Sequence, residues 1–326
     1  MNTYYRENRS KIQVFIDRFY KYGLYGVFVI LVILFSLLNS NFFSLNNVIN
    51  LLQQTSSTGI AAAGLVFVLL AGGIDISIAS TMFMTSMIAA TLTNMGLGLT
   101  GAIAVSITCG ALVGCINGFL IAKLRLVPLI VTLANLYIIR GVTIAIFGVK
   151  TVLFTNEVGG MIARTRLFGF IPFVVIILII ILALVQFILS HTLYGRQLYA
   201  IGNNRLGAET IGIKVTGNIF VSYVVCGAMA GLSGLVSGAQ VGGITPTFAT
   251  GQEFIIISAT VLGGVSLFGG RGKAFPGAFL GVLVIMCIEN GLVMAKTNMY
   301  AYTIVRGIVI FLAVMLDSLR NKGETR

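Results

Sequence analysis

Few residues in this chain are arranged for catalysis. The single histidine, His191, stands where an apolar stretch meets a polar one, which favours an interfacial structural role. All four cysteines lie inside apolar runs without zinc-ligand spacing, so we interpret them as packing residues. The sequence contains no HExxH, CxxC or GxSxG motif. The residue types therefore predict neither an enzyme nor a metal site.

The chain also lacks the phosphate-binding loop of P-loop ATPases. Gly272-Lys273 is its single Gly-Lys pair. Ala274 follows this pair where Ser or Thr is required, and Leu267 stands where the first glycine of the motif belongs. We therefore expect no ATP binding of the P-loop type in this chain.

Charged side chains interrupt several apolar stretches of the sequence. Those positions are Asp75, Arg140, Glu253, Glu289 and Arg306. A charge costs about 2.5–3.5 kcal/mol at the centre of a membrane helix, so each requires a partner or a wet cavity. Asp75 and Arg140 fit a solute path and a structural ion pair equally well. For Glu253 and Arg306, near the ends of their segments, the ion pair is favoured. Buried amides can bind either the hydroxyls of a sugar or a neighbouring helix. The candidate translocation-path residues are Asp75, Asn117, Asn135, Arg140 and Asn290.

These polar residues are embedded in a composition typical of membrane proteins. Hydrophobic residues make up 57% of the 326 residues and charged residues 9%, whereas soluble domains carry about 25% charged residues. A helix of about 20 apolar residues crosses a bilayer. The predicted fold is an all-α integral membrane protein with about ten transmembrane helices, the first of which is an uncleaved span. The predicted segments are Tyr22–Leu38, Val48–Leu70, Ile76–Leu92, Leu99–Ala122, Pro128–Gly148, Phe170–Leu189, Ile219–Gly238, Phe254–Phe268, Ala274–Met294 and Tyr300–Leu316.

Loop charge predicts the orientation of these segments. With the N-terminus in the cytoplasm, 15 of the 21 Lys and Arg residues fall on the cytoplasmic side, 4 fall outside and 2 lie within segments. This bias explains the net charge of +12 as topology, so nucleic acid is not expected as a partner. Both termini are predicted to be cytoplasmic. The predicted organisation is an N-terminal cytoplasmic segment 1–21, a transmembrane domain 22–318 containing a long cytoplasmic loop 191–217, and a cytoplasmic tail 319–326.

The long cytoplasmic loop has the pattern of a short helix. Asn203 or Asn204 can cap a helix of about two turns that begins at Arg205. Gly212 can end this helix in the left-handed conformation. One side of this helix carries small residues spaced four apart: Asn204, Ala208 and Gly212. This narrow side of the helix can pack against another protein. An ordinary connecting loop with one helical turn is the alternative.

Glycine spacing predicts close helix contacts and helix breaks. Small residues at i, i+4 spacing let helices approach closely in lipid. Such glycines are Gly110, Gly114 and Gly118 on one segment and Gly227 and Gly231 on another. Two further pairs, Gly72-Gly73 and Gly263-Gly264, interrupt apolar runs. Interrupted helices in paired positions often mark a permeation path, and an internal duplication remains open.

Residues of the long loop and of several other stretches follow the pattern of a known family. The matching loop positions are Gly195, Arg196, Tyr199, Ala200, Gly202, Asn204, Ala208, Gly212 and Ile213. The stretch GRQLYAIGNNRLGAETIGI resembles the cytoplasmic coupling loop of ribose-type permeases of bacterial ABC sugar importers. Further matches are LAGGIDIS, Asn117-Gly118, Arg140-Gly141, LGGVSLFGGRG and Asn290-Gly291, so the resemblance covers nearly the whole chain after the first segment. Asn203, Gly207 and Ile255-Ile256 depart from the family pattern.

The resemblance implies a transmembrane permease subunit that forms the translocation path for a monosaccharide in the bacterial inner membrane. It implies three protein partners: an ABC ATP-binding subunit, an extracytoplasmic sugar-binding protein and a second permease copy. ATP and Mg²⁺ would bind the ATPase, so no cofactor is expected in this chain. The residues expected to couple to the ATPase are Gly202, Asn203, Asn204, Gly207, Ala208, Glu209 and Gly212.

Other functions remain open at this point. A secondary carrier or channel for a small polar solute would need no docking helix, and it would usually contain an intramembrane ion or proton site. The sequence shows no dense acid/base relay, which argues against a proton-driven carrier. An ABC permease for branched-chain amino acids would be a more distant relative. An intramembrane enzyme is disfavoured by the missing catalytic pairs.

Overall fold

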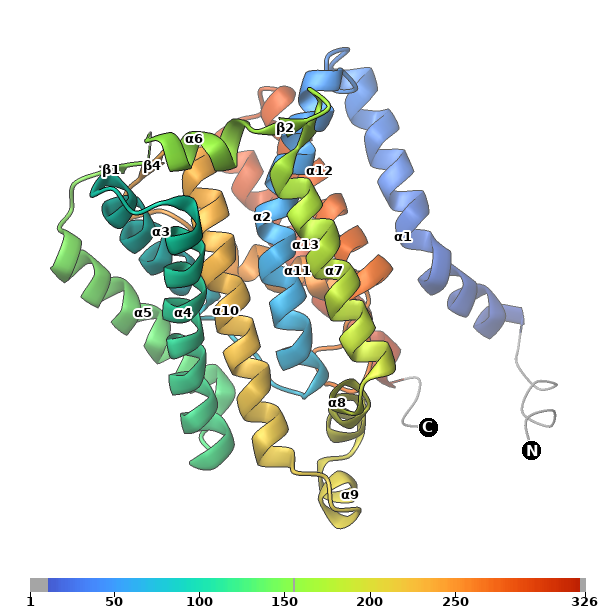
Figure 1. The fold of residues 1–326 in the computed structure, drawn as a ribbon. Helices are drawn as coiled ribbons and strands as arrows, with labels where there is room; N and C mark the ends of the chain where they lie inside the picture. Colours follow the sequence, from blue (N-terminus) through green and yellow to red (C-terminus); the bar gives the residue numbers. More distant parts are fainter. Residues whose placement is uncertain (1–10, 155, 323–326) are drawn as a thin grey trace.

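The computed structural model describes residues 11–154 and 156–322, which form a bundle of helices (Figure 1). Apolar stretches separated by polar or glycine-rich connections build the long helices. Their bounds are α1 (Lys11–Leu38), α2 (Leu45–Leu70), α3 (Ile78–Asn94), α4 (Leu99–Gly118), α5 (Pro128–Phe147), α7 (Phe173–His191), α10 (Val215–Val241), α11 (Gln252–Leu262), α12 (Phe279–Met294) and α13 (Met299–Lys322). Shorter elements are α6 (Glu157–Arg164), α8 (Leu193–Asn203), α9 (Arg205–Thr210) and the π-helical segments η1 (Phe119–Lys123) and η2 (Ala274–Ala278).

Each of the predicted apolar segments overlaps one of these long helices, and the chain is a multi-pass membrane protein. Within the described residues, 6 helical stretches are long and apolar enough to cross a membrane: α2, α4 with η1, α5, α7, α10, and η2 with α12. Shorter apolar stretches lie in α1, α11 and α13. The prediction of a segment reaching Phe268 is wrong, because α11 ends at Leu262. Beyond α11 the backbone takes positive φ at four glycines, and a right-handed helix cannot contain such residues. They are Gly264, Gly269, Gly270 and Gly272.

The centre of the bundle is formed by α2 and α10 (Figure 1). α10 packs against α4 at backbone distance, as the glycine spacing predicts. A Cβ atom added at Gly227 would lie 2.2 Å from the Gly110 carbonyl oxygen, and one at Gly114 would lie 2.2 Å from the Tyr223 carbonyl oxygen. The glycines therefore allow a helix crossing that larger side chains would prevent.

One end of the bundle carries the short strands and α6 (Figure 1). β1 (Val152–Leu153) pairs antiparallel with β4 (Gly243–Ile244), and β2 (Arg166–Leu167) pairs antiparallel with β3 (Ile171–Pro172). These strands of two residues each were not predicted, but they leave the predicted all-α class unchanged. Two-residue pairs close the loops around α6, a helix that hydropathy did not predict, because it is short and carries both Glu157 and Arg164.

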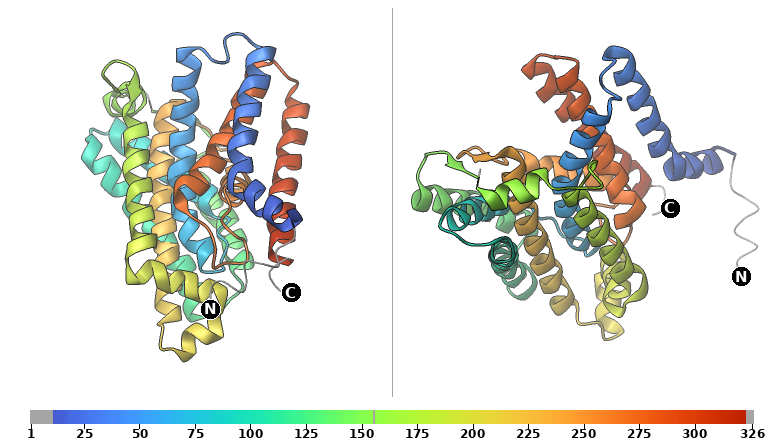
Figure 2. Two further views of the ribbon diagram at one scale, coloured as in Figure 1. Left: turned by 90° about the vertical axis from the view of Figure 1, so that its right-hand side faces the viewer. Right: turned by 45° about the horizontal axis from the view of Figure 1, so that its top comes forward.

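The opposite end carries α8 and α9, and α1 begins and α13 ends in this half of the molecule (Figure 2). α1 begins at Lys11, so it includes part of the segment 1–21 that was predicted to precede the first span. Residues 1–10 and 323–326, which belong to the predicted terminal segments, lie outside the described residues.

Candidate functional site

Helix α9 occupies the place predicted for the short helix of the long loop. The structure selects Asn204 as its cap: this residue has φ −155°, and its side-chain oxygen accepts a hydrogen bond of 2.9 Å from the Gly207 amide. α9 runs from Arg205 to Thr210, and Gly212 follows with φ +82°. The helix and its left-handed exit are therefore confirmed.

Helix α8 was missed by the sequence analysis. Thr192 caps it, because its hydroxyl accepts a hydrogen bond of 3.2 Å from the Gly195 amide. The glycines and polar residues of α8 hid it from a hydropathy criterion, and a threonine three residues before Gly195 was the available signal. The predicted single-helix loop therefore contains two helices, joined at Asn204.

Three segments that are distant in sequence meet at Gly202, the penultimate residue of α8. A Cβ atom at this position would lie 2.0 Å from the Leu70 carbonyl oxygen and 2.2 Å from the Gly270 amide nitrogen. Those two atoms form a hydrogen bond of 3.0 Å, which joins the end of α2 to the connection 263–273. The glycine at position 202 is therefore required by contact with two glycine-rich helix breaks.

Polar side chains of α8 hold the same connection. Asn203, which does not cap α9, donates from its side-chain amide to the Tyr199 carbonyl oxygen at 2.8 Å and to the Gly270 carbonyl oxygen at 3.2 Å. The Tyr199 hydroxyl donates to the Gly272 carbonyl oxygen at 2.7 Å. Burial raises the pKa of Tyr199, so this hydroxyl keeps its proton and remains a donor. A displacement of α8 must therefore move the connection 263–273.

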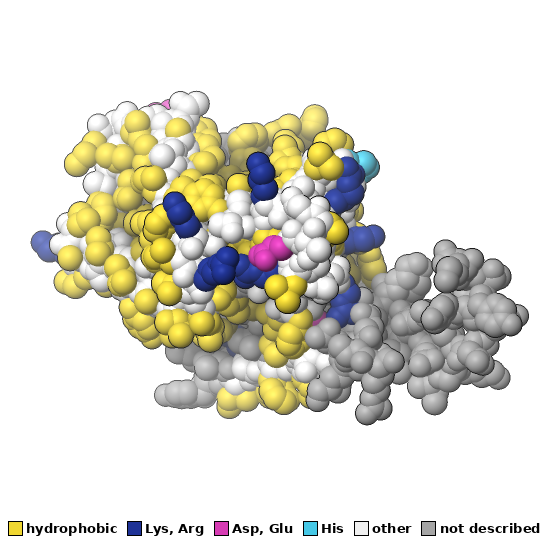
Figure 3. Space-filling view, turned by 90° about the horizontal axis from the view of Figure 1, so that it is seen from below, with side chains coloured by type: hydrophobic (Ala, Val, Ile, Leu, Met, Phe, Trp, Pro, Cys, Tyr) yellow, Lys and Arg dark blue, Asp and Glu magenta, His cyan; other side chains and the backbone are white. Residues whose placement is uncertain are grey.

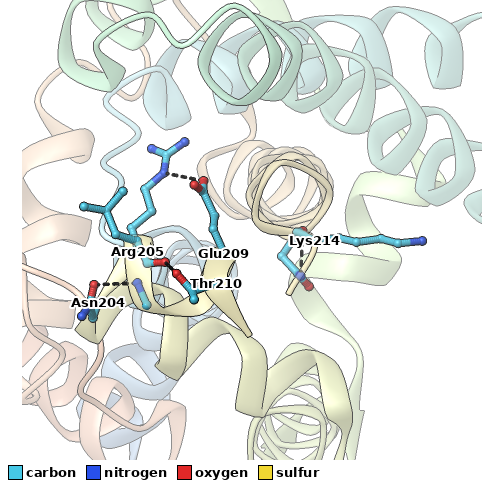
Figure 4. A network of polar contacts seen from close by, with 8 residues as sticks. Asn204, Arg205, Glu209, Thr210 and Lys214 are labelled. Atoms are coloured by element: carbon cyan, nitrogen blue, oxygen red, sulfur yellow. Dashed lines mark hydrogen bonds and ion pairs between the residues drawn. The ribbon is translucent and has the colours of Figure 1, made fainter. Parts of the chain in front are cut away.

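The outer surface of α9 combines exposed apolar and charged side chains. Leu206 is 76% exposed and Ile211 is 75% exposed, whereas Ala208 is buried on the opposite face. Arg205 and Glu209 form an ion pair of 3.7 Å along the helix, and Lys214 extends away from it at the start of α10 (Figure 4). Viewed from this end, Lys and Arg side chains are spread across the face around an acidic one (Figure 3). This end of the molecule therefore presents an apolar tip, formed by Leu206 and Ile211 at α9, with basic side chains around it.

Three candidate path residues lie together in one buried network. Asp75, in the connection between α2 and α3, accepts hydrogen bonds from the Ser77 amide at 2.9 Å and from the Ser77 hydroxyl at 2.6 Å. Asn117 on α4 donates to the Ser77 hydroxyl oxygen at 2.8 Å and to Asp75 at 3.5 Å. Asn135 on α5 donates to the Asn117 side-chain oxygen. The network joins α4 and α5 to the break between α2 and α3.

Replacing Asn117 with leucine is expected to lower the melting temperature by roughly 2–10 °C, because each buried polar group left unpaired costs about 1–3 kcal/mol. Thermal unfolding of the purified protein in detergent measures this effect. Ser106→Ala, also on α4, is the matched control, because the buried Ser106 hydroxyl has no hydrogen-bond partner among the described residues. Equal melting temperatures for the two variants would show that the network does not stabilise the fold.

The other two candidate path residues lie elsewhere. Arg140 on α5 donates to the carbonyl oxygens of Pro246 at 2.8 Å and Phe248 at 3.2 Å, and its guanidinium lies 5.0 Å from the centre of the Phe83 ring. It therefore ties α5 to the connection before α11. Asn290 exchanges two hydrogen bonds with Asn47, of 2.8 Å and 3.1 Å, and so joins α12 to α2.

The end of the bundle that carries α6 has a groove that the sequence did not reveal. It has a volume of about 790 Å³ and lies between α6 and the end of α10. Its lining includes the polar residues Asn156, Glu157, Arg164 and Gln240. Such a lining can receive a polar solute or a loop of another protein. Among the residues that the structure describes, no group of three or more His, Cys, Asp or Glu side chains could hold a metal ion.

Comparison with known proteins gives a consistent result. Residues 47–314 match the family described as branched-chain amino acid transport system / permease component. The chain is 35% identical over 301 residues to the ribose import permease protein RbsC of Escherichia coli K12, covering 90% of this chain and 92% of that protein. The corresponding protein of Bacillus subtilis 168 is 35% identical over 298 residues, covering 91% and 92%. The D-allose transport system permease protein AlsC of Escherichia coli K12 is 33% identical over 305 residues, covering 93% of each chain. No solved structure matches the chain.

Proposed function

Because the chain belongs to the family of branched-chain amino acid transport system permease components, we propose that it is the membrane-spanning permease of an ABC importer for a monosaccharide. One observation carries the proposal: a capped helix with an exposed apolar tip is seated, through Gly202, on the breaks of two membrane helices. The ribose and D-allose permeases named above support a sugar over a branched-chain amino acid as substrate. The chain is a transport subunit and not an enzyme.

In this proposal the chain crosses the membrane ten times, once at each long helix, with both termini in the cytoplasm. The short helix α11 (11 residues) crosses together with the connections on either side of it. The basic residues support this orientation. The connections at the end of α8 and α9 carry Lys123, Arg125, Arg196, Arg205, Lys214, Arg271 and Lys273, whereas those at the end of α6 carry Lys150, Arg164, Arg166 and Lys296. Since cytoplasmic loops are enriched in Lys and Arg, the face of α8 and α9 lies in the cytoplasm.

The ATP-binding subunit docks on this face, with the apolar tip of α9 entering a groove of the ATPase. Two of the expected coupling residues, Gly202 and Asn203, hold the helix pair to the membrane helices. A third, Glu209, lies on the exposed surface beside Leu206, which was not among the predicted coupling residues. ATP and Mg²⁺ bind the partner. The ATPase can drive transport because its nucleotide-bound form binds the inward- and outward-open permease with different affinity.

The other partners meet the permease on different surfaces. An extracytoplasmic sugar-binding protein delivers the substrate at the end of α6, where the groove between α6 and α10 lies. A second permease copy completes the translocation path, and the lipid bilayer covers the remaining apolar surface.

The polar residues that were predicted to line the path hold the helices beside it. The geometry of the helix break between α2 and α3 is set by Asp75, Asn117 and Asn135. Arg140 fixes the connection before α11. Asn290 holds α12 against α2 through its hydrogen bonds with Asn47.

The decisive test of this function is purification of the tagged chain in mild detergent, followed by reconstitution. Recovery of an ATP-binding-cassette subunit and ATP-dependent uptake of a sugar support the proposal. Recovery of the chain alone, together with uptake in proteoliposomes without ATP, would identify a secondary carrier, and Asp75 and Arg140 would then be mutated first. Competition by leucine but not by sugars would identify a branched-chain amino-acid permease.

Ala208→Trp is expected to lower uptake by about 5- to 150-fold, because over-packing at a buried site costs about 1–3 kcal/mol and displaces α9 from its seat. The amount of protein in the membrane should stay unchanged, while recovery of the ATPase with the permease should fall. Gly26→Trp on α1 is the control, since nothing lies within 4 Å of a Cβ atom there. Normal docking and uptake in Ala208→Trp would exclude α9 as the coupling helix.

A further inference from the structure

The connection between α11 and η2, residues 263–273, is a structured loop. The Ser266 amide donates to the Arg271 carbonyl oxygen at 2.9 Å, and the Phe268 amide donates to the Ser266 hydroxyl oxygen at 3.2 Å. Gly269 and Gly270 adopt φ of +90° and +70°. These bonds close the loop on itself, so force applied at one side of it reaches the other side.

One side of this loop contacts the proposed coupling segment. Gly270 and Gly272 receive the side chains of Asn203 and Tyr199 from α8. Gly270 also donates to the last carbonyl of α2, at Leu70. The loop therefore shares a hydrogen-bonded junction with α8 and α2.

The other side of the loop is held by Asp317, near the end of α13. The Asp317 side chain is buried, and its Oδ2 atom accepts hydrogen bonds from the Leu267 amide at 2.9 Å and from the Ser266 hydroxyl at 3.3 Å. Hydrogen bonds to a carboxylate are stronger than those between neutral groups. α13 in turn packs on α11 and is joined to α12 by an ion pair of 2.9 Å between Arg306 and Glu289.

We propose that the loop 263–273 carries the movement of α8 and α9 to α13, and that Asp317 is the positioning residue that completes this link. The inference rests on the proposed function, since the movement originates in the docked ATPase. It adds a second route to the direct contact of Gly202 with α2. Through it, the half of the bundle formed by α11, α12 and α13 responds to the same cytoplasmic displacement as α2.

The test uses the complete transporter, with its ATPase and binding protein, in proteoliposomes. Asp317→Ala is expected to lower uptake per permease by about tenfold, because a hydrogen bond to a charged group is lost from one conformational state. ATPase recovery and basal ATP hydrolysis should stay at the wild-type level. Asp317→Asn, which retains an acceptor oxygen, should restore uptake to within about threefold of wild type.

Tyr199→Phe removes the hydrogen bond to Gly272 on the opposite side of the loop and provides a double-mutant cycle. If the loop is one link, the combined Tyr199→Phe and Asp317→Ala variant loses less uptake than the product of the two single effects. Multiplicative effects would overturn the inference, as would wild-type uptake in Asp317→Ala. If Asp317→Ala fails to reach the membrane, Ser266→Ala, which removes one of the two donors, takes its place in the cycle. Absence of ATP-dependent uptake by the wild-type transporter would instead refute the proposed function.

Discussion

Replacing Gly202 with valine is expected to lower ATP-dependent uptake by about two orders of magnitude. The new Cβ atom would overlap the Leu70 carbonyl oxygen and the Gly270 amide, both of which are backbone atoms that no rotamer change can move away. Over-packing of about 3 kcal/mol changes a conformational equilibrium by a factor of about 100. The measurement is uptake into proteoliposomes, normalised to the amount of permease inserted.

Gly217→Val provides the control for this prediction. Gly217 lies in the first turn of α10, on the same face of the molecule, and nothing lies within 4 Å of a Cβ atom added there. This variant should transport at close to the wild-type rate. Normal uptake in Gly202→Val would mean that α8 and the helix breaks do not move as one unit.

Replacing Gly227 with leucine is expected to remove the folded permease from the membrane. A Cβ atom there would lie 2.2 Å from the Gly110 carbonyl oxygen and 2.8 Å from the Gly114 amide nitrogen, so α10 must separate from α4. In lipid, close packing replaces the hydrophobic effect as the force between helices, so this separation removes the interaction itself. A cost of about 3 kcal/mol or more is a large part of a typical stability of about 5–15 kcal/mol.

Thermal unfolding in detergent, followed by size-exclusion chromatography, measures this destabilisation. Gly141→Leu on α5 is the matched substitution, because nothing lies within 4 Å of a Cβ atom at that position. We expect Gly141→Leu to melt close to wild type and Gly227→Leu to aggregate at a much lower temperature. Similar melting curves for both variants would show that the α4–α10 crossing contributes little to stability.

The sequence located the membrane helices well, because about 20 apolar residues in succession have few other uses in a protein. It also located α9, since capping by Asn204 and the exit at Gly212 depend on local chemistry. The boundary of α11 was wrong, because Val265, Leu267 and Phe268 are apolar but lie in a loop whose glycines set the backbone. Hydropathy does not distinguish such a loop from a helix.

The contacts between distant segments were beyond the sequence analysis. Asp75, Asn117 and Asn135 were selected for their polarity, but their hydrogen bonds to one another depend on how α4 and α5 pack. Arg140 and Asn290 carried the same signal and lie in separate contacts. Tertiary packing decides which polar residues of the membrane helices contact one another. Hydropathy cannot predict this packing, because apolar residues cover both the buried face and the lipid-facing surface of each helix. Helix α8 was not predicted because it is short and polar, so hydropathy gives no signal for it. The groove beside α6 was not predicted because its polar lining comes from segments that only the folded chain brings together.

The central position of α2 has a consequence for the synthesis of the protein. α2 is among the first helices to leave the ribosome, yet 83% of its most apolar stretch is buried in the folded chain. Ser233 on α10, which donates to the Ser57 carbonyl oxygen, follows 176 residues later. At about 5–20 residues per second, the ribosome needs roughly 9–35 s to supply it. During that time the Thr55 to Thr58 stretch must be sheltered by the insertion machinery or by helices already in place, so assembly of this permease depends on keeping α2 in a protected state until α10 arrives.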